Sequence, residues 1–443
     1  MSAHEAADAG NFLLVTSTAI LFITYALIIS ERINRSVIAL LGAGFTIALG
    51  VLNQEQAIAA IDFNTLGLLA GMMMIVGVSK KSGLFGYVAI RAAQIVRGSP
   101  AGIMMAFVIV TAMFSALLDN VTTVLLLVPV TFVVCGELKL PVYPFLFTEI
   151  FAGNIGGTAT LIGDPPNILI GSAAGLNFND FVVALAPVVL IILVLQMIAN
   201  HLIWGIKLKA SAEERARVMS LNAREMIVDK YLLVCSLGVI SMVMLAFTTA
   251  HFIKLEAATI AMFGAAILLL LESFVHKPHK HSELVTHAFH EVEWITLFFF
   301  VGLFIVIGGV EHAGLLNMAA NKLLSVTGGN LEIMTYGILW TSAILSAIVD
   351  NIPFVATMIP LINSVAPVMG GEHVIMPLWW ALSLGACLGG NGTLVGASAN
   401  LTVAGLAEKN GVHFSFVKFT ALAFPMMLAS IAIAHVYLMW RFF

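Results

Sequence analysis

Apolar runs long enough to cross a lipid bilayer recur along almost all of this 443-residue chain. Only 10 % of its residues are charged, against roughly 25 % in soluble domains. A membrane-spanning helix needs about 20 apolar residues, so we predict an all-α polytopic membrane protein. The apolar runs lie near residues 12–30, 36–52, 64–79, 101–118, 121–135, 142–156, 181–206, 231–249, 255–271, 294–310, 331–349, 352–368, 377–389 and 414–440.

The composition argues against several other classes of protein. The net charge is −4, and no basic stripe or tail offers a surface for nucleic acid. The three cysteines lie in apolar runs without the short spacing of metal or redox motifs, which favours core packing. We expect no cofactor and no bound metal. No basic region precedes the first apolar run, so we expect a first span and not a cleaved signal peptide.

Two connectors between the apolar runs are markedly polar. Residues 207–230 carry both charge signs in a helix-like pattern, which predicts a cytoplasmic linker helix. Residues 273–293 are rich in histidine, and histidine clusters can bind metal. No spacing here fixes a coordination geometry, so a solvated loop is favoured. These histidines are His276, His279, His281, His287 and His290.

The distribution of Lys and Arg sets the predicted orientation. We place the N-terminus outside and treat residues 101–135 and 331–368 as re-entrant hairpins. All but three of the 20 Lys and Arg residues then fall on the cytoplasmic side. Cytoplasmic loops are enriched in Lys and Arg, so this bias supports the topology and a multi-pass location in a bacterial inner membrane. The three exceptions are Lys254, Lys322 and Arg441.

The two halves of the chain repeat the same motifs. FSALLDNVTTVLLLVPV at 114–130 aligns with LSAIVDNIPFVATMIPL at 345–361, which pairs two Asp-Asn dipeptides. IGGTATLIGDPPN at 155–167 aligns with LGGNGTLVGASAN at 388–400. Hydrophobic helices can match through composition alone, but matching Asp-Asn pairs at hairpin centres and matching Gly-rich helix breaks are hard to obtain by chance. The alignment therefore predicts an internal repeat.

The repeat also predicts the arrangement of the domains. Residues 63–84 align with 294–315. The first repeat, residues 1–206, starts outside in the predicted topology, and the second, residues 231–443, starts inside. The repeats are therefore inverted, an architecture of secondary transporters that places the substrate at the repeat interface.

An acidic residue lies at the centre of each predicted hairpin. A carboxylate inside a span commonly costs a few kcal/mol or more, so it is retained where it faces water, an ion or a partner. The alternative role is helix capping at the hairpin tip, and the two roles can coexist. The tips supply the candidate substrate- or ion-binding residues Asp119, Asn120, Thr122, Thr123, Asp350 and Asn351.

Each half also contains a predicted broken helix, at 142–175 and at 377–407. Glycines and prolines interrupt both segments or their flanks, and unwound backbone in a bilayer is tolerated only where it lines a cavity or is buried in protein. The freed carbonyl groups suit cations, and the freed N–H groups suit anions or hydroxyls. A packing kink is the alternative. The breaks supply the candidates Asn154, Gly157, Thr158, Thr160, Asp164, Asn167, Gly390, Asn391, Thr393, Ser398 and Asn400.

These motifs resemble the ion transporter superfamily. DNVTT, EIFAGNIGGTATLIGDPPN, VDNIPF and GGNGTLVGASAN are similar to its arsenite permease and pink-eyed-dilution P protein branch, which is related to sodium/proton antiporters. The resemblance covers nearly the whole chain. It implies a homodimer with a scaffold and a moving transport domain of hairpins and broken helices, working as an elevator. Dicarboxylate and sulfate carriers of the superfamily have Ser-Asn-Thr at the tips, whereas the acidic tips here would repel a dianion.

The chemistry of the motifs narrows the substrate. They are acidic and rich in hydroxyl groups, with no Lys or Arg, which favours a cation, a proton or a neutral hydroxylated solute. We predict arsenite or antimonite efflux by proton antiport. Sodium/proton antiport is the alternative, and an organic or inorganic anion is less favoured. Cys387 offers a soft sulfur ligand, although one thiol does not make a site. No ATP-binding loop is present, and a cytoplasmic ATPase partner stays open.

Two other classes fit the sequence less well. Paired membrane aspartates suggest an intramembrane aspartyl protease. However, Asp119 and Asp350 are repeat mates at hairpin tips, and the Gly-x-Gly-Asp sequence of that class is absent. A channel is the other alternative. We expect a secondary transporter and not an enzyme.

We predict that single cysteines at Arg97 and Lys139 react with a membrane-impermeant maleimide from the same face of the membrane. The two positions flank the first hairpin, and a re-entrant segment returns to the side it left. Labelling from opposite faces would show that residues 101–135 cross the bilayer outright.

Overall fold

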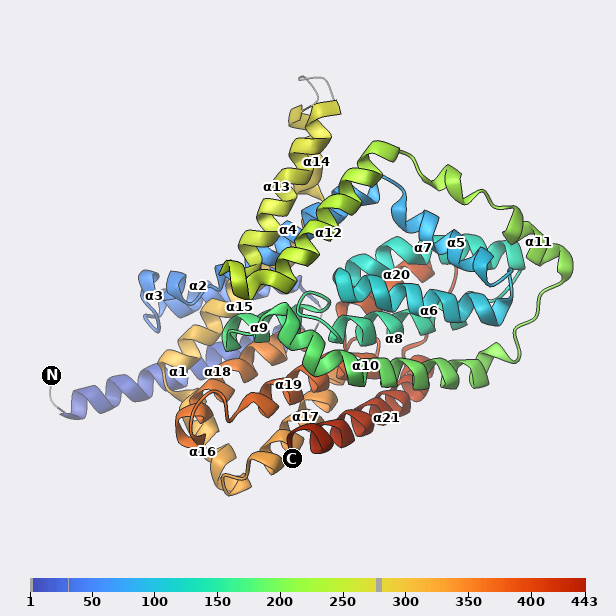
Figure 1. Cartoon of the computed structure of the whole chain (residues 1–443). Coiled ribbons are helices and arrows are strands. Elements are labelled where there is room, and N and C mark those ends of the chain that lie inside the picture. The colour runs from blue at the N-terminus through green and yellow to red at the C-terminus, as the bar shows by residue number, and fades with distance from the viewer. Residues whose placement is uncertain (1–2, 31, 276–280) are drawn as a thin grey trace.

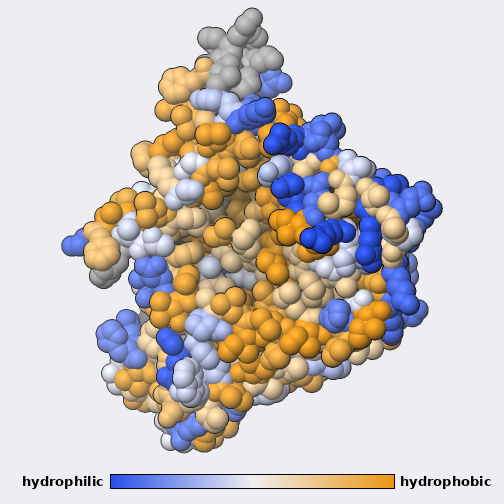
Figure 2. All heavy atoms as spheres, turned by 45° about the vertical axis from the view of Figure 1, so that its right-hand side comes forward, coloured by the Kyte–Doolittle hydropathy of each residue, from blue (hydrophilic) through white to orange (hydrophobic). Residues whose placement is uncertain are grey.

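The computed structural model describes residues 3–30, 32–275 and 281–443, which form helices and no β-strand (Figure 1). Eleven helices among these residues are long and apolar enough to cross a membrane. In Figure 2 apolar residues cover much of the surface, while hydrophilic residues gather at the edge that carries the linker between the halves. The predicted all-α polytopic fold is confirmed.

The first half runs from α1 to α10, and most of its apolar helices begin and end within a few residues of the predicted runs. Its helices are α1 (Ala3–Ile29), α2 (Arg35–Ala48), α3 (Gln54–Ala59), α4 (Phe63–Lys80), α5 (Leu84–Ile95), α6 (Pro100–Leu117), α7 (Asn120–Leu138), α8 (Tyr143–Thr158), α9 (Pro165–Ala174) and α10 (Phe178–Asn200).

The second half repeats this order after the linker. Its helices are α12 (Lys230–Ile253), α13 (Ala257–Val275), α14 (His281–His290), α15 (Trp294–His312), α16 (Leu315–Thr327), α17 (Leu331–Ile348), α18 (Asn351–Met369), α19 (Met376–Gly389), η4 (Gly390–Gly392), α20 (Ser398–Lys409) and α21 (Phe416–Phe442).

Each predicted hairpin is a pair of helices joined by a two-residue extended break. Leu118 and Asp119 separate α6 from α7, and Val349 and Asp350 separate α17 from α18. Both aspartates are N-cap residues whose carboxylates accept backbone N–H groups, which satisfies donors that a helix start leaves free. The sequence therefore located both tips. Re-entry from opposite faces stays a prediction.

Close packing joins each hairpin to the broken helix of its own repeat. Ser115 donates to the Gly153 carbonyl at 2.6 Å, and its repeat mate Ser346 donates to the Ala386 carbonyl at 2.6 Å. Glycine makes this approach possible, because a Cβ on Gly156 would collide with the backbone of α6 at Ala112. The repeat is thus a repeat of contacts as well as of sequence.

Two polar connectors differ from the prediction. The linker holds only a short helix, α11 (Ala212–Ser220), and a 3₁₀ turn, Ala223–Met226. The backbone leaves the helical conformation at Leu221, which ends α11, and the Asn222 side chain caps the start of the 3₁₀ turn. Residues 281–290 form helix α14 and not a loop. His276 and His279 lie outside the described residues.

We predict that Gly156→Ala lowers the free energy of unfolding in detergent by about 1–3 kcal/mol, the usual cost of overpacking a tight core. Gly136→Ala in α7 is the matched control, since an added Cβ there meets nothing within 4 Å. Thermal unfolding followed by tryptophan fluorescence measures both. Equal stability of the two variants would contradict the tight α6–α8 contact.

Candidate functional site

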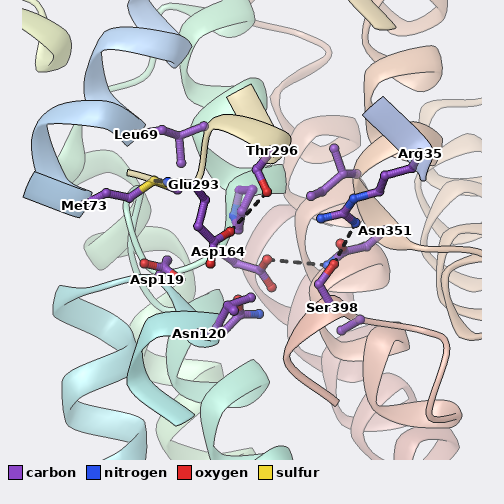
Figure 3. Close-up of a pocket in the computed structure, with 14 residues that line it drawn as sticks. Arg35, Leu69, Met73, Asp119, Asn120, Asp164, Glu293, Thr296, Asn351 and Ser398 are labelled. Atoms are coloured by element: carbon purple, nitrogen blue, oxygen red, sulfur yellow. Dashed lines mark hydrogen bonds between the residues drawn. The ribbon is translucent and has the colours of Figure 1, made fainter. Parts of the chain in front are cut away.

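A small cavity lies where the hairpin tips and helix breaks of both repeats meet (Figure 3). Its volume is about 20 Å³, which is room for about one water molecule. Helices α2, α4 and α15 close it from the side. Nine of its polar or sulfur-bearing lining residues are Arg35, Met73, Asp119, Asn120, Asp164, Glu293, Thr296, Asn351 and Ser398.

Asp119 contributes a carboxylate from the tip of the first hairpin. Its Oδ1 accepts the Thr122 backbone N–H at 2.7 Å, and its Oδ2 accepts the Thr122 hydroxyl. Capping and cavity lining therefore coexist at Asp119. Thr122 acts through Asp119 and is not among the lining residues of this cavity.

Asp350 makes the ion pair at the tip of the second hairpin. Its Oδ2 lies 2.7 Å from Arg35 Nη1 and accepts the Ser398 hydroxyl at 2.7 Å. Arg35 also donates to Ser398 at 2.8 Å, and its guanidinium lies over the Phe299 ring at 5.1 Å. Arg35 therefore ties α2 to the second hairpin and to the start of α20.

Asp164 is the most enclosed acidic group of the cavity, with 1 % of its surface exposed. It precedes α9, but its side chain caps no backbone N–H of that helix. Its Oδ1 accepts from Asn351 at 3.4 Å, whereas Oδ2 has no hydrogen-bond partner among the described residues. The Cys387 thiol is a close neighbour of this carboxyl group. A buried carboxyl oxygen without a donor is expensive, and it is free to take a proton or a cation.

Glu293 brings a fourth carboxyl group, from the start of α15. Its Oε2 accepts the Thr296 hydroxyl at 3.1 Å, and it makes no side-chain cap to the backbone of α15. In Figure 3 Glu293 lies on the same side of the cavity as Asp119. Asp119, Asp164 and Glu293 thus line the cavity together with Arg35, whose ion-pair partner Asp350 lines the adjoining cavity.

A buried network of amides joins the two repeats beneath this cavity. Asn154 in α8 accepts from Asn120 at 3.0 Å and donates to Asn391 and Asn400, each at 3.0 Å. All four residues are at most 3 % exposed. One side chain therefore holds the first hairpin tip and the second helix break together.

The repeat mates Asn167 and Asn400 stabilise the two helix breaks in the same way. The amide of Asn167 donates to the Thr160 carbonyl at 2.9 Å, and that of Asn400 donates to the Thr393 carbonyl at 2.8 Å. Cys387 supports the first of these breaks, since its thiol lies 3.5 Å from Asn167 Oδ1. Its packing role is thereby explained.

The remaining predicted residues do not line the cavity, and all of them except Thr123 lie at the helix breaks. The hydroxyls of Thr160 and Thr393 donate to the carbonyls of Ala116 and Ala347. The Thr158 hydroxyl donates to the Asn154 carbonyl, and the carbonyls of Gly157 and Gly390 accept from the amides of Asn167 and Asn400. Thr123 Oγ1 has no partner among the described residues.

Sequence reasoning missed Arg35 and Glu293 because each lies at the edge of an apolar run, where charge is usual. A signal was present for Glu293. It directly precedes the repeated segment that starts at Trp294, and Asp62 occupies the same position in the first repeat. Within the described residues, no group of three His, Cys, Asp or Glu side chains could hold a metal ion.

Buried carboxyl and amide groups thus meet at the interface of two repeats in a polytopic membrane protein, which is where secondary transporters bind their substrates. The chain belongs to the citrate transporter (CitMHS) family, whose model matches residues 25–385.

Relatives and solved structures agree with this class. An uncharacterized transporter of Mycobacterium tuberculosis is 42 % identical over 433 residues, which cover 97 % of this chain and 99 % of that protein. The P protein of Homo sapiens is 34 % identical over 504 residues, covering 96 % of this chain and 59 % of that protein. The YdaH transporter of Alcanivorax borkumensis shares the fold, with a TM-score of 0.61 over 96 % of this chain and 97 % of that one at 14 % identity.

We predict that Asn154→Ala lowers the free energy of unfolding by about 1–3 kcal/mol for each buried partner left without a hydrogen bond. Asn410→Ala is the control, because that exposed amide donates to its own helix at Leu406. A loss no larger than the control's, measured by thermal unfolding in detergent, would show that the network carries little of the stability.

Proposed function

We propose that this chain is a secondary active transporter that exports arsenite or antimonite in exchange for protons. The carrying observation is the buried Oδ2 of Asp164, which has no hydrogen-bond partner within the described part of the chain and belongs to a residue that lines the same cavity as Asp119. A carboxyl group in this setting binds a proton favourably, because ionisation in a poorly solvated site is costly. Solute and proton would then compete for one site, which is the basis of exchange.

The charge of the site supports a neutral or cationic solute. Asp119, Asp164 and Glu293 supply three carboxyl groups to the cavity, and the guanidinium of Arg35 is already paired with a fourth, that of Asp350 in the adjoining cavity. An anion entering this site would meet unpaired carboxylates. Arsenous acid is neutral and carries hydroxyl groups that amides and carboxylates can bind.

Size argues in the same direction, although the family takes its description from citrate. A cavity of about 20 Å³ holds about one water molecule and would have to open widely for a tricarboxylate. A small solute needs much less rearrangement. We therefore do not extend citrate transport to this chain.

Sodium/proton antiport is the second candidate, and the same oxygen of Asp164 favours it. Hard cations take carboxylate and amide oxygens as ligands, and Asp119 and Asn120 line the cavity beside Asp164. An elevator motion of the hairpins and broken helices against the other helices would carry either solute.

The direct test uses purified protein in proteoliposomes that enclose a pH-sensitive dye. We expect an imposed arsenite gradient to move protons in the opposite direction, with sodium having no effect. Proton movement driven by sodium alone would replace the first candidate by the second. If neither arsenite nor sodium drives proton movement, both candidates are contradicted.

We predict that Asp119→Asn reduces coupled proton flux at least about tenfold, which corresponds to about 1.4 kcal/mol of barrier. Asn caps a helix about as well as Asp, so the fold should be retained while the charge is lost. Asp229→Asn is the matched control, since Asp229 caps α12 by accepting from Leu232. Wild-type flux from folded Asp119→Asn protein would leave Asp164 as the better coupling residue.

A further inference from the structure

Helices α4 and α15 carry the same polar feature at equivalent positions of the two repeats. Asp62 precedes the first residue of α4, and Glu293 precedes the first residue of α15. In both cases the threonine three residues further on donates its hydroxyl to the carboxylate, Thr65 to Asp62 and Thr296 to Glu293. The pair is thus conserved within the molecule in both sequence position and hydrogen bonding.

The two carboxylates line different cavities. Glu293 lines the small site cavity together with Met73, whose sulfur lies 3.4 Å from the Glu293 backbone nitrogen. Asp62 lines a larger cavity, of about 380 Å³, together with Phe304, the repeat mate of Met73. Asp62 and Phe304, which line the larger cavity, are therefore the repeat mates of Glu293 and Met73, which line the site cavity.

The carboxylates also differ in what they bind. Asp62 Oδ1 accepts the backbone N–H groups of Asn64 and Thr65 at 3.0 and 3.2 Å. Glu293 accepts no backbone N–H at the start of α15 and faces the cavity that contains Asp119 (Figure 3). One carboxylate is engaged with the site, and the other caps its own helix beside a larger cavity.

Inverted repeats alternate between two states when the halves exchange their conformations. In the present state the first hairpin tip and Glu293 line the same cavity. After such an exchange, the second hairpin tip would lie beside Asp62 in the equivalent way. We propose that Asp62 is a positioning residue that meets the transport site in the opposite-facing state. The inference rests on the alternating access of the proposed function but not on which solute is carried.

The Arg35–Asp350 ion pair holds the structure in its present state. The pair links α2 to the second hairpin at 2.7 Å, and its side chains are 27 % and 16 % exposed. It has to break before the second tip can reach Asp62. Removing the guanidinium should therefore shift the population toward the opposite-facing state.

Cross-linking tests this placement without any need for transport. Two cysteine pairs are made in a chain whose three native cysteines are replaced by serine or alanine. Glu293→Cys with Asn120→Cys reports the present state, because both positions line the site cavity. Asp62→Cys with Asn351→Cys places cysteines at the two repeat mates and reports the opposite state. A short bifunctional methanethiosulfonate bridges each pair, and the rate is followed by gel electrophoresis after proteolysis.

We expect both pairs to cross-link, and Arg35→Gln to speed the second pair and slow the first by about threefold each, the effect of losing one partly exposed ion pair. Arg32→Gln, on the same loop and lining the cavity next to Arg35, should leave both rates unchanged. Cross-linking of the first pair shows that the variants fold. If the second pair then fails to react, or Arg35→Gln moves both rates in one direction, Asp62 does not meet the site. Loss of arsenite transport alone would overturn the proposed solute and leave this result standing.

Discussion

The structure depends on hydrogen-bond partners for the backbone groups at the helix breaks and for the acidic side chains in the middle of an apolar protein. Neither feature is tolerated in hydrocarbon without polar partners. Many of the partners come from the same repeat, and Asn154 adds a link to the other repeat, since its amide donates to Asn391 and Asn400 while its carbonyl oxygen accepts from Asn120. The two halves therefore complete each other, and the site exists only where they meet.

The repeat is symmetric in its framework and asymmetric in its chemistry. Asn167 and Asn400 stabilise their helix breaks through the same contacts. The residues differ at several mated positions, and two of these differences set the chemistry of the site, because Asp164 corresponds to Ala397 and Asn154 corresponds to Cys387. The first repeat thus supplies the enclosed carboxyl group and the bridging amide. An asymmetric site of this kind can bind one proton or solute on a frame that moves symmetrically.

Much of this arrangement could be predicted from the sequence, and the reason is local. Asp119 and Asp350 mark the hairpin tips because a charged residue in a long apolar run has few other roles, and Pro165 with its glycine neighbours marks a helix break. Arg35 and Glu293 could not be placed in the same way. Each borders a polar connector, where charge needs no explanation, and only tertiary packing brings the start of α2 and of α15 to the hairpin tips. The linker was overestimated as a helix for a related reason, since its charge pattern favours helix while Asn222 caps a new turn.

The central claim is that solute and proton share the carboxyl-rich cavity between the repeats. The most direct measurement is calorimetric titration of arsenite into the detergent-solubilised protein, repeated in buffers with different ionisation enthalpies. Because binding that displaces a proton transfers it to the buffer, the account predicts a binding heat that varies with the buffer and corresponds to release of about one proton. It also predicts a smaller release from Asp164→Asn. Arsenite binding with the same heat in every buffer would contradict the account.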